Sequence, residues 1–201
     1  MTSRSIIIRI ALAAAVAMIP TVASAHVGIG STMGFAHGFS HPMSGLDHTL
    51  AMVAVGMFAA NLGGRALWAV PLTFVGVMAV GGVLGVLGVA VPFVEAGIAL
   101  SVIVLGAAVA LRWKAPVAVA VGLVGLFALF HGHAHGSEMP VSASGLTYGL
   151  GFLLATATLH AIGIGLGLGL TRFGSRYAPR AIQASGAAMA VAGAGILTGA
   201  L

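Results

Sequence analysis

Histidine and carboxylate side chains that could bind a metal ion are concentrated in two short segments of this sequence. The first is His-Pro-Met-Ser-Gly-Leu-Asp-His at residues 41–48, and the second is Phe-His-Gly-His-Ala-His-Gly-Ser-Glu at residues 130–138. The chain has 8 histidines, 3 acidic residues and no cysteine. Imidazole combined with carboxylate suits borderline divalent ions such as Ni, Zn, Co and Fe(II), whereas the lack of thiolate argues against Cu(I). The two segments therefore predict a site for a divalent cation.

The first segment is predicted to lie at the start of a helix. Proline is favoured at the first helical position, so Pro42 predicts a helix start with His41 as its cap. His41 and His48 would then lie two turns apart on one face, with Asp47 beside His48. The Asp47 carboxylate could accept an N–H bond from the imidazole or bind the metal directly. The alternative is that these groups only cap and solvate a helix end.

The second segment has the spacing of a single helix face. His131, His135 and Glu138 stand at positions i, i+4 and i+7, so a continuous helix would align all three. His133 would then point elsewhere. The alternative is a histidine-rich solvated loop that binds metals loosely, but a carboxylate in register with two imidazoles favours a specific site.

Two isolated ionisable residues add to these segments. Glu95 follows the start of an apolar run, and its alternative role is a helix N-terminal carboxylate favoured by the macrodipole. His160 lies near the middle of a long apolar run, where a lone histidine either bonds a neighbouring helix or serves a translocation path. Both are taken as candidate metal-handling residues.

Composition indicates that the elements positioning these residues cross a membrane. Charged residues make up 5% of the chain, hydrophobic residues 60%, and the mean hydropathy is +1.15. These values lie far outside the range of soluble domains. The net charge of +5 does not indicate nucleic-acid binding, because the cations are scattered and form no basic patch. We predict an all-α integral membrane protein.

The order of segments predicts the topology. Residues 1–25 have the positive start, apolar core and Ala-Ser-Ala cleavage site of a signal peptide, which leaves a single transporter-like domain at 26–201. Apolar runs long enough to cross ~30 Å of hydrocarbon predict six transmembrane helices at 42–62, 66–90, 93–111, 115–133, 145–171 and 181–200. The cations after residue 25 then fall on one side, which the positive-inside rule makes cytoplasmic: Arg65, Arg112, Lys114, Arg172, Arg176 and Arg180. Both termini are predicted to be periplasmic.

The 31 glycines are predicted to let these helices approach closely. Gly81 and Gly85, and Gly163 and Gly167, are four residues apart, which places small residues along one helix face. No GxGxxG motif occurs in a strand-to-helix context, so the glycines do not indicate nucleotide binding.

The two histidine segments resemble the signatures of the HupE/UreJ family, His-Pro-x-x-Gly-x-Asp-His at 41–48 and Phe-His-Gly-x-Ala-His-Gly-x-Glu at 130–138. The resemblance covers essentially the whole chain. It implies a small, multi-pass protein of the bacterial inner membrane that acts as a secondary nickel or cobalt permease and serves nickel enzymes such as hydrogenase or urease. It also implies metal-handling roles for His41, Asp47, His48, His131, His135 and Glu138. It supports neither His37 nor His133, whose roles stay open together with that of His26.

The expected function is therefore uptake of Ni2+, or else Co2+, as transported substrate, with no enzymatic activity and no resident cofactor. Residues of the two motifs would capture the ion, Glu95 would add negative charge to the vestibule, and His160 would lie on the path to the cytoplasm. The sequence has no ATPase motif, so transport is expected to be secondary. Two other functions stay open: a membrane metal-binding accessory or sensor for metalloenzyme maturation, and a haem-ligating electron carrier. The expected partners are the ion and the lipid bilayer, and the oligomeric state is open.

Overall fold

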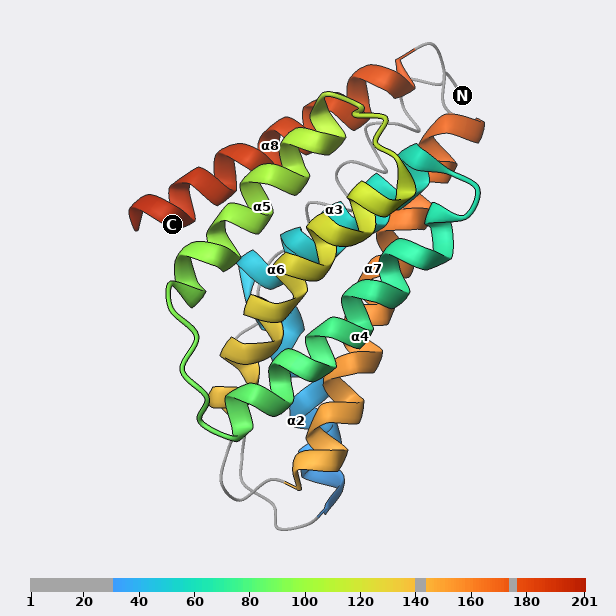
Figure 1. Ribbon diagram of the computed structural model, residues 1–201. Coiled ribbons are helices and arrows are strands. Elements are labelled where there is room, and N and C mark those ends of the chain that lie inside the picture. Colours follow the sequence, from blue (N-terminus) through green and yellow to red (C-terminus); the bar gives the residue numbers. More distant parts are fainter. Residues whose placement is uncertain (1–30, 140–143, 174–176) are drawn as a thin grey trace.

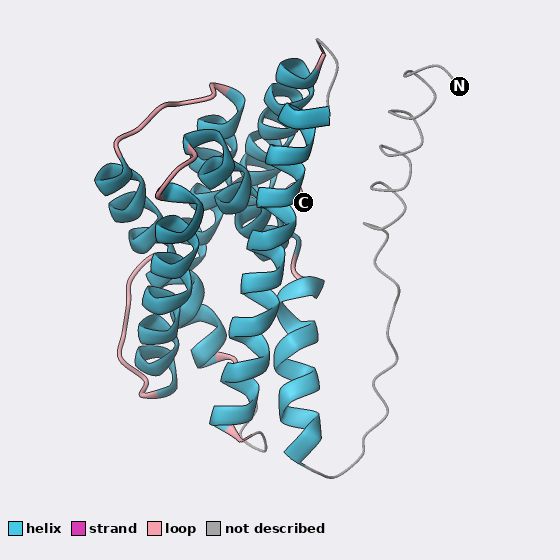
Figure 2. Cartoon of the chain, turned by 90° about the vertical axis from the view of Figure 1, so that its right-hand side faces the viewer, coloured by secondary structure: helices cyan, strands magenta, loops and turns pink. Residues whose placement is uncertain are grey.

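The computed structural model describes residues 31–139, 144–173 and 177–201, and these residues form helices and short connections without a strand (Figures 1 and 2). The predicted signal peptide, His26 and Arg176 lie outside the described residues. The helices are α2 (Ser31–Ser44), α3 (Leu46–Leu62), α4 (Ala66–Val86), α5 (Val94–Ala110), α6 (Val117–Ser137), α7 (Gly145–Phe173) and α8 (Ala178–Thr198). The all-α prediction is confirmed for this part of the chain.

The lengths of these helices support a multi-pass membrane protein. Among the described helices, α4, α6, α7 and α8 are each long and apolar enough to cross a bilayer, and α2 with α3 passes the same test as a bent pair. Helix α5 is apolar but has 17 residues. At 1.5 Å per residue it extends about 26 Å, slightly less than the ~30 Å of a typical hydrocarbon core. The structure thus supports four or five of the six predicted spans by length and composition.

The prediction that a helix starts at Pro42 is wrong. Pro42 lies inside the last turn of α2, the chain breaks at Gly45, and α3 begins at Leu46 at an angle of 82° to α2. His41 and His48 therefore do not share a helix face. The preference of proline for a first helical turn gave the wrong boundary because Gly45, with an extended backbone (φ −81°, ψ 124°), is where the helix ends. The bend places the two histidines on different helices.

Helix α3 occupies the centre of the bundle. Its residues Ala51, Met52, Ala54, Val55 and Phe58 are fully buried, and α7, α5 and α4 all pack against it. The other extensive helix–helix contacts are between α4 and α6, between α5 and α8, and between α2 and α7. A side chain pointing inward from α3 is therefore surrounded by other helices and not by lipid.

Glycines set the spacing between α6 and α4. A Cβ at Gly132 would lie 2.0 Å from the Met78 carbonyl oxygen, and one at Gly136 would lie 2.1 Å from the Gly82 carbonyl oxygen. Gly81 and Gly85 make equally close approaches from α4, which confirms the packing predicted for that pair. Gly163 and Gly167 likewise face α3, as predicted. Helix α6 thus continues without interruption past its histidines and packs closely against α4.

Cations and histidines lie at opposite ends of the described bundle. Helix α3 begins beside Asp47 and His48 and ends at Leu62, where the Asn61 amide donates to the Trp113 carbonyl at 2.9 Å and the Asn61 carbonyl accepts from Lys114. Helix α6 starts just after Lys114 and ends among His131, His133 and His135. Figure 1 shows this histidine end at the bottom, where α2, α6 and the start of α7 meet.

Candidate metal centre

Two groups of potential metal ligands lie next to each other at the end of the bundle where α2, α3 and α6 meet. Among the described residues, the inner group consists of His48, His131 and His135, and the outer group consists of His41, His135 and Glu138. Within each group the candidate ligand atoms all lie within 4.8 Å of one another. His135 belongs to both.

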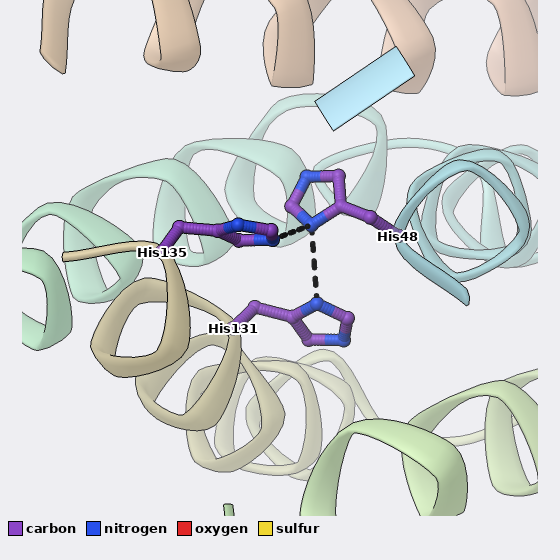
Figure 3. A group of neighbouring side chains, drawn as sticks. All are labelled: His48, His131 and His135. Carbon is purple, nitrogen blue, oxygen red and sulfur yellow. Dashed lines mark hydrogen bonds between the residues drawn. The ribbon is translucent and has the colours of Figure 1, made fainter. Parts of the chain in front are cut away.

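The inner group is built from α3 and α6 and is almost entirely shielded from solvent (Figure 3). His48 and His131 are 0% exposed. His48 Nδ1 lies 3.2 Å from His131 Nδ1 and 3.1 Å from His135 Nε2. Ligands 2.0–2.1 Å from an ion stand about 3.3 Å apart in a tetrahedral site and about 2.9 Å apart in adjacent octahedral positions. The ring nitrogens are therefore already spaced as metal ligands.

Ser101 fixes which nitrogen of His131 carries the hydrogen. The Ser101 hydroxyl, from the middle of α5, donates to the Ile98 carbonyl at 2.6 Å and lies 2.8 Å from His131 Nε2. Because the hydroxyl hydrogen is already used, the Ser101 oxygen accepts from His131, whose Nε2 carries the N–H. The lone pair of His131 is then on Nδ1, the atom that faces His48.

Thr156 does the same for His48. The Thr156 hydroxyl, from α7, donates to the Met78 sulfur at 3.7 Å and lies 3.3 Å from His48 Nε2. When the Thr156 hydrogen is directed to the sulfur, the hydroxyl oxygen accepts from His48 Nε2–H, and this tautomer leaves the lone pair on Nδ1. A hydroxyl behind each imidazole is the usual means by which proteins orient a metal-binding histidine.

In these two tautomers, the ring nitrogen of His48 that carries no hydrogen (a bare nitrogen) faces the bare nitrogen of His131. The 3.2 Å contact between His48 Nδ1 and His131 Nδ1, dashed in Figure 3, is a hydrogen bond only when one of the two nitrogens carries a hydrogen, and in the tautomers set by Ser101 and Thr156 both are acceptors. Facing lone pairs in a buried place are unfavourable unless a cation or a donor lies between them. The hydrogen-bond network thus prepares the inner group to bind a cation.

The outer group is more open and carries the site's carboxylate. His41 Nε2 lies 3.1 Å from His135 Nδ1, and the Glu138 carboxylate lies 3.5 Å from both nitrogens. The side chains of His41 and Glu138 are 30% and 55% exposed. Glu138 follows the last turn of α6, in the register that aligns it with His131 and His135. This group is accessible to an ion arriving from water.

Aromatic rings hold the imidazoles in place. Phe152 packs against the rings of His48 and His135 at 5.2 and 4.7 Å between centroids, and Phe74 packs against His131 at 5.8 Å. Beside His135 lies an apolar pocket of about 470 Å³, lined by α4, α6 and α7. These apolar neighbours exclude water from the inner group and strengthen its electrostatic interactions.

His160 is buried close to the inner group without a polar partner. It is 1% exposed, and neither ring nitrogen has a hydrogen-bond partner among the described residues. It follows Thr156 by one helical turn on α7, and its ring meets Phe74 edge-on at 5.2 Å. Phe74 thus touches both His131 and His160. The predicted position of His160 in the interior, beyond the histidine segments, agrees with this placement.

Four other candidate residues lie outside both groups. The Asp47 carboxylate accepts the backbone N–H of His48 at 2.7 Å, as a group at a helix start does, and Glu95 is exposed in the first turn of α5. His133 points away to the Val89 carbonyl at 2.7 Å, as its position in the helix predicts. His37 is exposed and contacts the rings of His41 and Tyr148. A metal role for Asp47 or Glu95 stays a prediction.

Two residues of the centre were not identified from the sequence, Ser101 and Thr156. Ser101 and Glu95 are the only strongly polar residues between positions 93 and 111, so an isolated hydroxyl in an apolar run was an available signal. Thr156 had no such signal, because α7 contains other threonines that bond only to their own helix, such as Thr158.

A bundle of long apolar helices with a buried histidine group defines a multi-pass membrane protein with a candidate metal centre. The chain matches the family described as "HupE / UreJ protein" over residues 14–196. It is 49% identical over 181 residues to "Protein HupE" of Rhizobium leguminosarum bv. viciae, which covers 90% of this chain and 93% of that protein. The chain belongs to the HupE/UreJ family. No solved structure matches it significantly.

Proposed function

We propose that this protein carries a divalent transition-metal ion, Ni2+ in the first place and Co2+ as the alternative, from the periplasm into the cytoplasm. The observation that carries the proposal is the buried pair His48 Nδ1 and His131 Nδ1, 3.2 Å apart. Family membership and the choice of imidazole over thiolate both favour a borderline divalent ion.

The proposed path begins at the exposed outer group. Glu138 supplies negative charge where the ion still keeps much of its water, and His41 and His135 replace part of that shell. The ion then reaches the inner group, where three imidazoles hold it without a compensating carboxylate. From there His160, neither of whose nitrogens has a partner among the described residues, receives it on the way to the cytoplasmic end.

The proposed orientation follows from the distribution of charge. The described cations Arg65, Arg112 and Lys114 lie at the end opposite the histidines, which the positive-inside rule assigns to the cytoplasm. In this arrangement α3 and α5 cross the membrane with the four longer helices, giving six spans. Glu95, at the start of α5, and Asp47, at the start of α3, then lie on the periplasmic side, where they attract cations.

The membrane potential is sufficient to drive uptake. It contributes ~2.3 kcal/mol per charge per 100 mV, and hence ~4.6 kcal/mol for a divalent cation moving inward. That free energy corresponds to roughly a thousandfold accumulation at equilibrium. A facilitated path therefore suffices, without ATP hydrolysis and without obligatory proton coupling.

The structure does not favour a haem-ligating electron carrier. Bis-histidine haem ligation places two nitrogens about 4 Å apart on opposite sides of a flat macrocycle. In the inner group His48 Nδ1 lies 3.1–3.2 Å from a nitrogen of His131 and of His135, and Phe74 and Phe152 pack against these rings. A macrocycle has no space between them.

The test is ion flux into proteoliposomes that contain the purified full-length protein. We expect Ni2+ entry that rises with an imposed potential, negative inside, and that falls at least tenfold in His48→Gln. His133→Gln is the matched control, because His133 lies on the same helix as the site but contacts Val89. If the wild type binds Ni2+ but gives no flux above empty liposomes, the protein is an accessory or sensor and the proposal fails.

A further inference from the structure

The inner and outer groups use different nitrogens of the same imidazole. His135 Nε2 faces His48 Nδ1 at 3.1 Å, whereas His135 Nδ1 faces His41 Nε2 at 3.1 Å and the Glu138 carboxylate at 3.5 Å. The ring of His135 therefore stands between the two candidate sites, with one ligand atom directed to each.

We propose that the two groups are alternative positions of a single ion, so that the protein binds one ion per chain and passes it from one side of the His135 ring to the other. This inference rests on the proposed function, since it assumes that the ion enters at the outer group and leaves from the inner one. It adds that the two sites are never filled together.

The chemistry of imidazole is the first reason. A neutral ring has a lone pair on one nitrogen and a hydrogen on the other, so it can ligate an ion in only one group at a time. Filling both groups would require an imidazolate with two divalent ions about 6 Å apart, the sum of two bonds of ~2 Å and the width of the ring.

Charge is the second reason. Two divalent ions would bring four positive charges to a place where Glu138 is the only carboxylate in either group. Asp47 bonds the His48 backbone and Glu95 is exposed on α5, so neither compensates that charge directly. The inner group is also buried, where like charges repel more strongly than in water.

Each position leaves the second nitrogen of His135 with a suitable partner. With the ion on Nδ1, the hydrogen on Nε2 is donated to the bare His48 Nδ1. With the ion on Nε2, the hydrogen on Nδ1 is donated to Glu138 or His41. In the handover the bond from the ion to Nδ1 breaks and the bond to Nε2 forms. The hydrogen on Nε2 leaves with a water molecule that the ion carries in, and Nδ1 takes up a hydrogen from water at the exposed outer group. The net charge of the ring is unchanged.

The test is Co2+ titration of the full-length protein in detergent, followed by equilibrium dialysis and by the visible absorption of the bound ion. We expect the wild type to saturate at one Co2+ per chain. Glu138→Gln removes an outer ligand and His131→Gln an inner ligand, and we expect each variant still to bind one ion, held by the group left intact. The two variants should therefore give different spectra, one of three imidazoles and one that includes the Glu138 carboxylate. His135→Gln should weaken binding more than either.

Two wild-type ions per chain would overturn the inference. It also fails if His131→Gln or Glu138→Gln abolishes all binding, or if the two variants give the same spectrum, because the ion would then not have two alternative positions. These outcomes are distinct from failure of the proposed function. A protein that binds two ions and still transports contradicts the shared position alone, whereas one that binds a single ion without flux contradicts transport alone.

Discussion

The Nδ1 atoms of His48 and His131 face each other across 3.2 Å, and the opposite nitrogen of each ring is bonded to a hydroxyl group. Ser101 and Thr156 come from α5 and α7, so four helices cooperate to present two lone pairs at one point. Two oriented lone pairs distinguish a preorganised cation site from a chance cluster of histidines. The role of each hydroxyl can be tested by substituting Ser101 and Thr156 separately.

Replacing Ser101 by alanine should weaken metal binding about 10- to 100-fold, the usual effect of losing a group that orients a metal ligand. Without Ser101, the hydrogen of His131 can move to Nδ1 and bond the bare nitrogen of His48, which closes the site. The measurement is Ni2+ affinity of the purified protein, together with the rise in Tm on adding Ni2+.

Ser185→Ala is the matched control for Ser101→Ala. The Ser185 hydroxyl also bonds a carbonyl of its own helix, at Ala181, and Ser185 belongs to neither histidine group. A metal-dependent rise in Tm that is as large in Ser101→Ala as in Ser185→Ala would contradict the assigned role.

Thr156→Val keeps the shape of the side chain and removes its hydroxyl. The His48 Nε2–H then has no acceptor, which costs about 1–3 kcal/mol in a buried place. We expect a lower Tm and a Ni2+ affinity reduced about tenfold. Thr158→Val, two residues along the same helix and only partly buried, should change neither. Equal Ni2+ affinities for the two variants would show that Thr156 does not orient His48.

His160→Leu separates binding from transport. Because both nitrogens of His160 are buried without a partner among the described residues, an apolar side chain of similar size should leave Tm equal or raise it by a few degrees. Ni2+ affinity should stay within about threefold, since His160 belongs to neither group, while flux into proteoliposomes should fall at least tenfold. Wild-type flux in this variant would remove His160 from the path.

Gly132→Ala tests how the motif glycines position the site. The added methyl group would meet the Met78 carbonyl at 2.0 Å, so α6 must move away from α4. We expect destabilisation of about 1–3 kcal/mol or more and loss of high-affinity Ni2+ binding. Gly122→Ala, on the same helix, has open space around the new Cβ and should be neutral or slightly stabilising. Thermal unfolding in detergent compares them, and similar Tm values would contradict the close packing.

The sequence alone predicted the helical class and the second histidine segment well. The i, i+4, i+7 spacing of His131, His135 and Glu138 depends only on a continuous helix, and α6 continues through Ser137. The outward direction of His133 follows from the same geometry. Local periodicity was sufficient for these features because the ligands come from consecutive turns of one element.

The first segment was predicted less well because its geometry depends on tertiary structure. The 82° bend at Gly45 places His41 and His48 on separate helices, and both nevertheless reach His135. Local preference for Pro42 at a helix start carried no information on that bend. The contacts of Ser101 and Thr156 with the histidines are likewise set by helix packing, which one sequence does not encode in a readable pattern.

The most direct test of the central claim is the X-ray absorption spectrum of Ni2+ bound to the purified wild-type protein. For the wild type we predict nitrogen ligands at about 2.0–2.1 Å, with the multiple scattering of at least two imidazoles. An imidazole contribution should be lost in His48→Gln or His131→Gln but not in His133→Gln. A first shell made of oxygen alone, or a spectrum that none of the three substitutions alters, would contradict it.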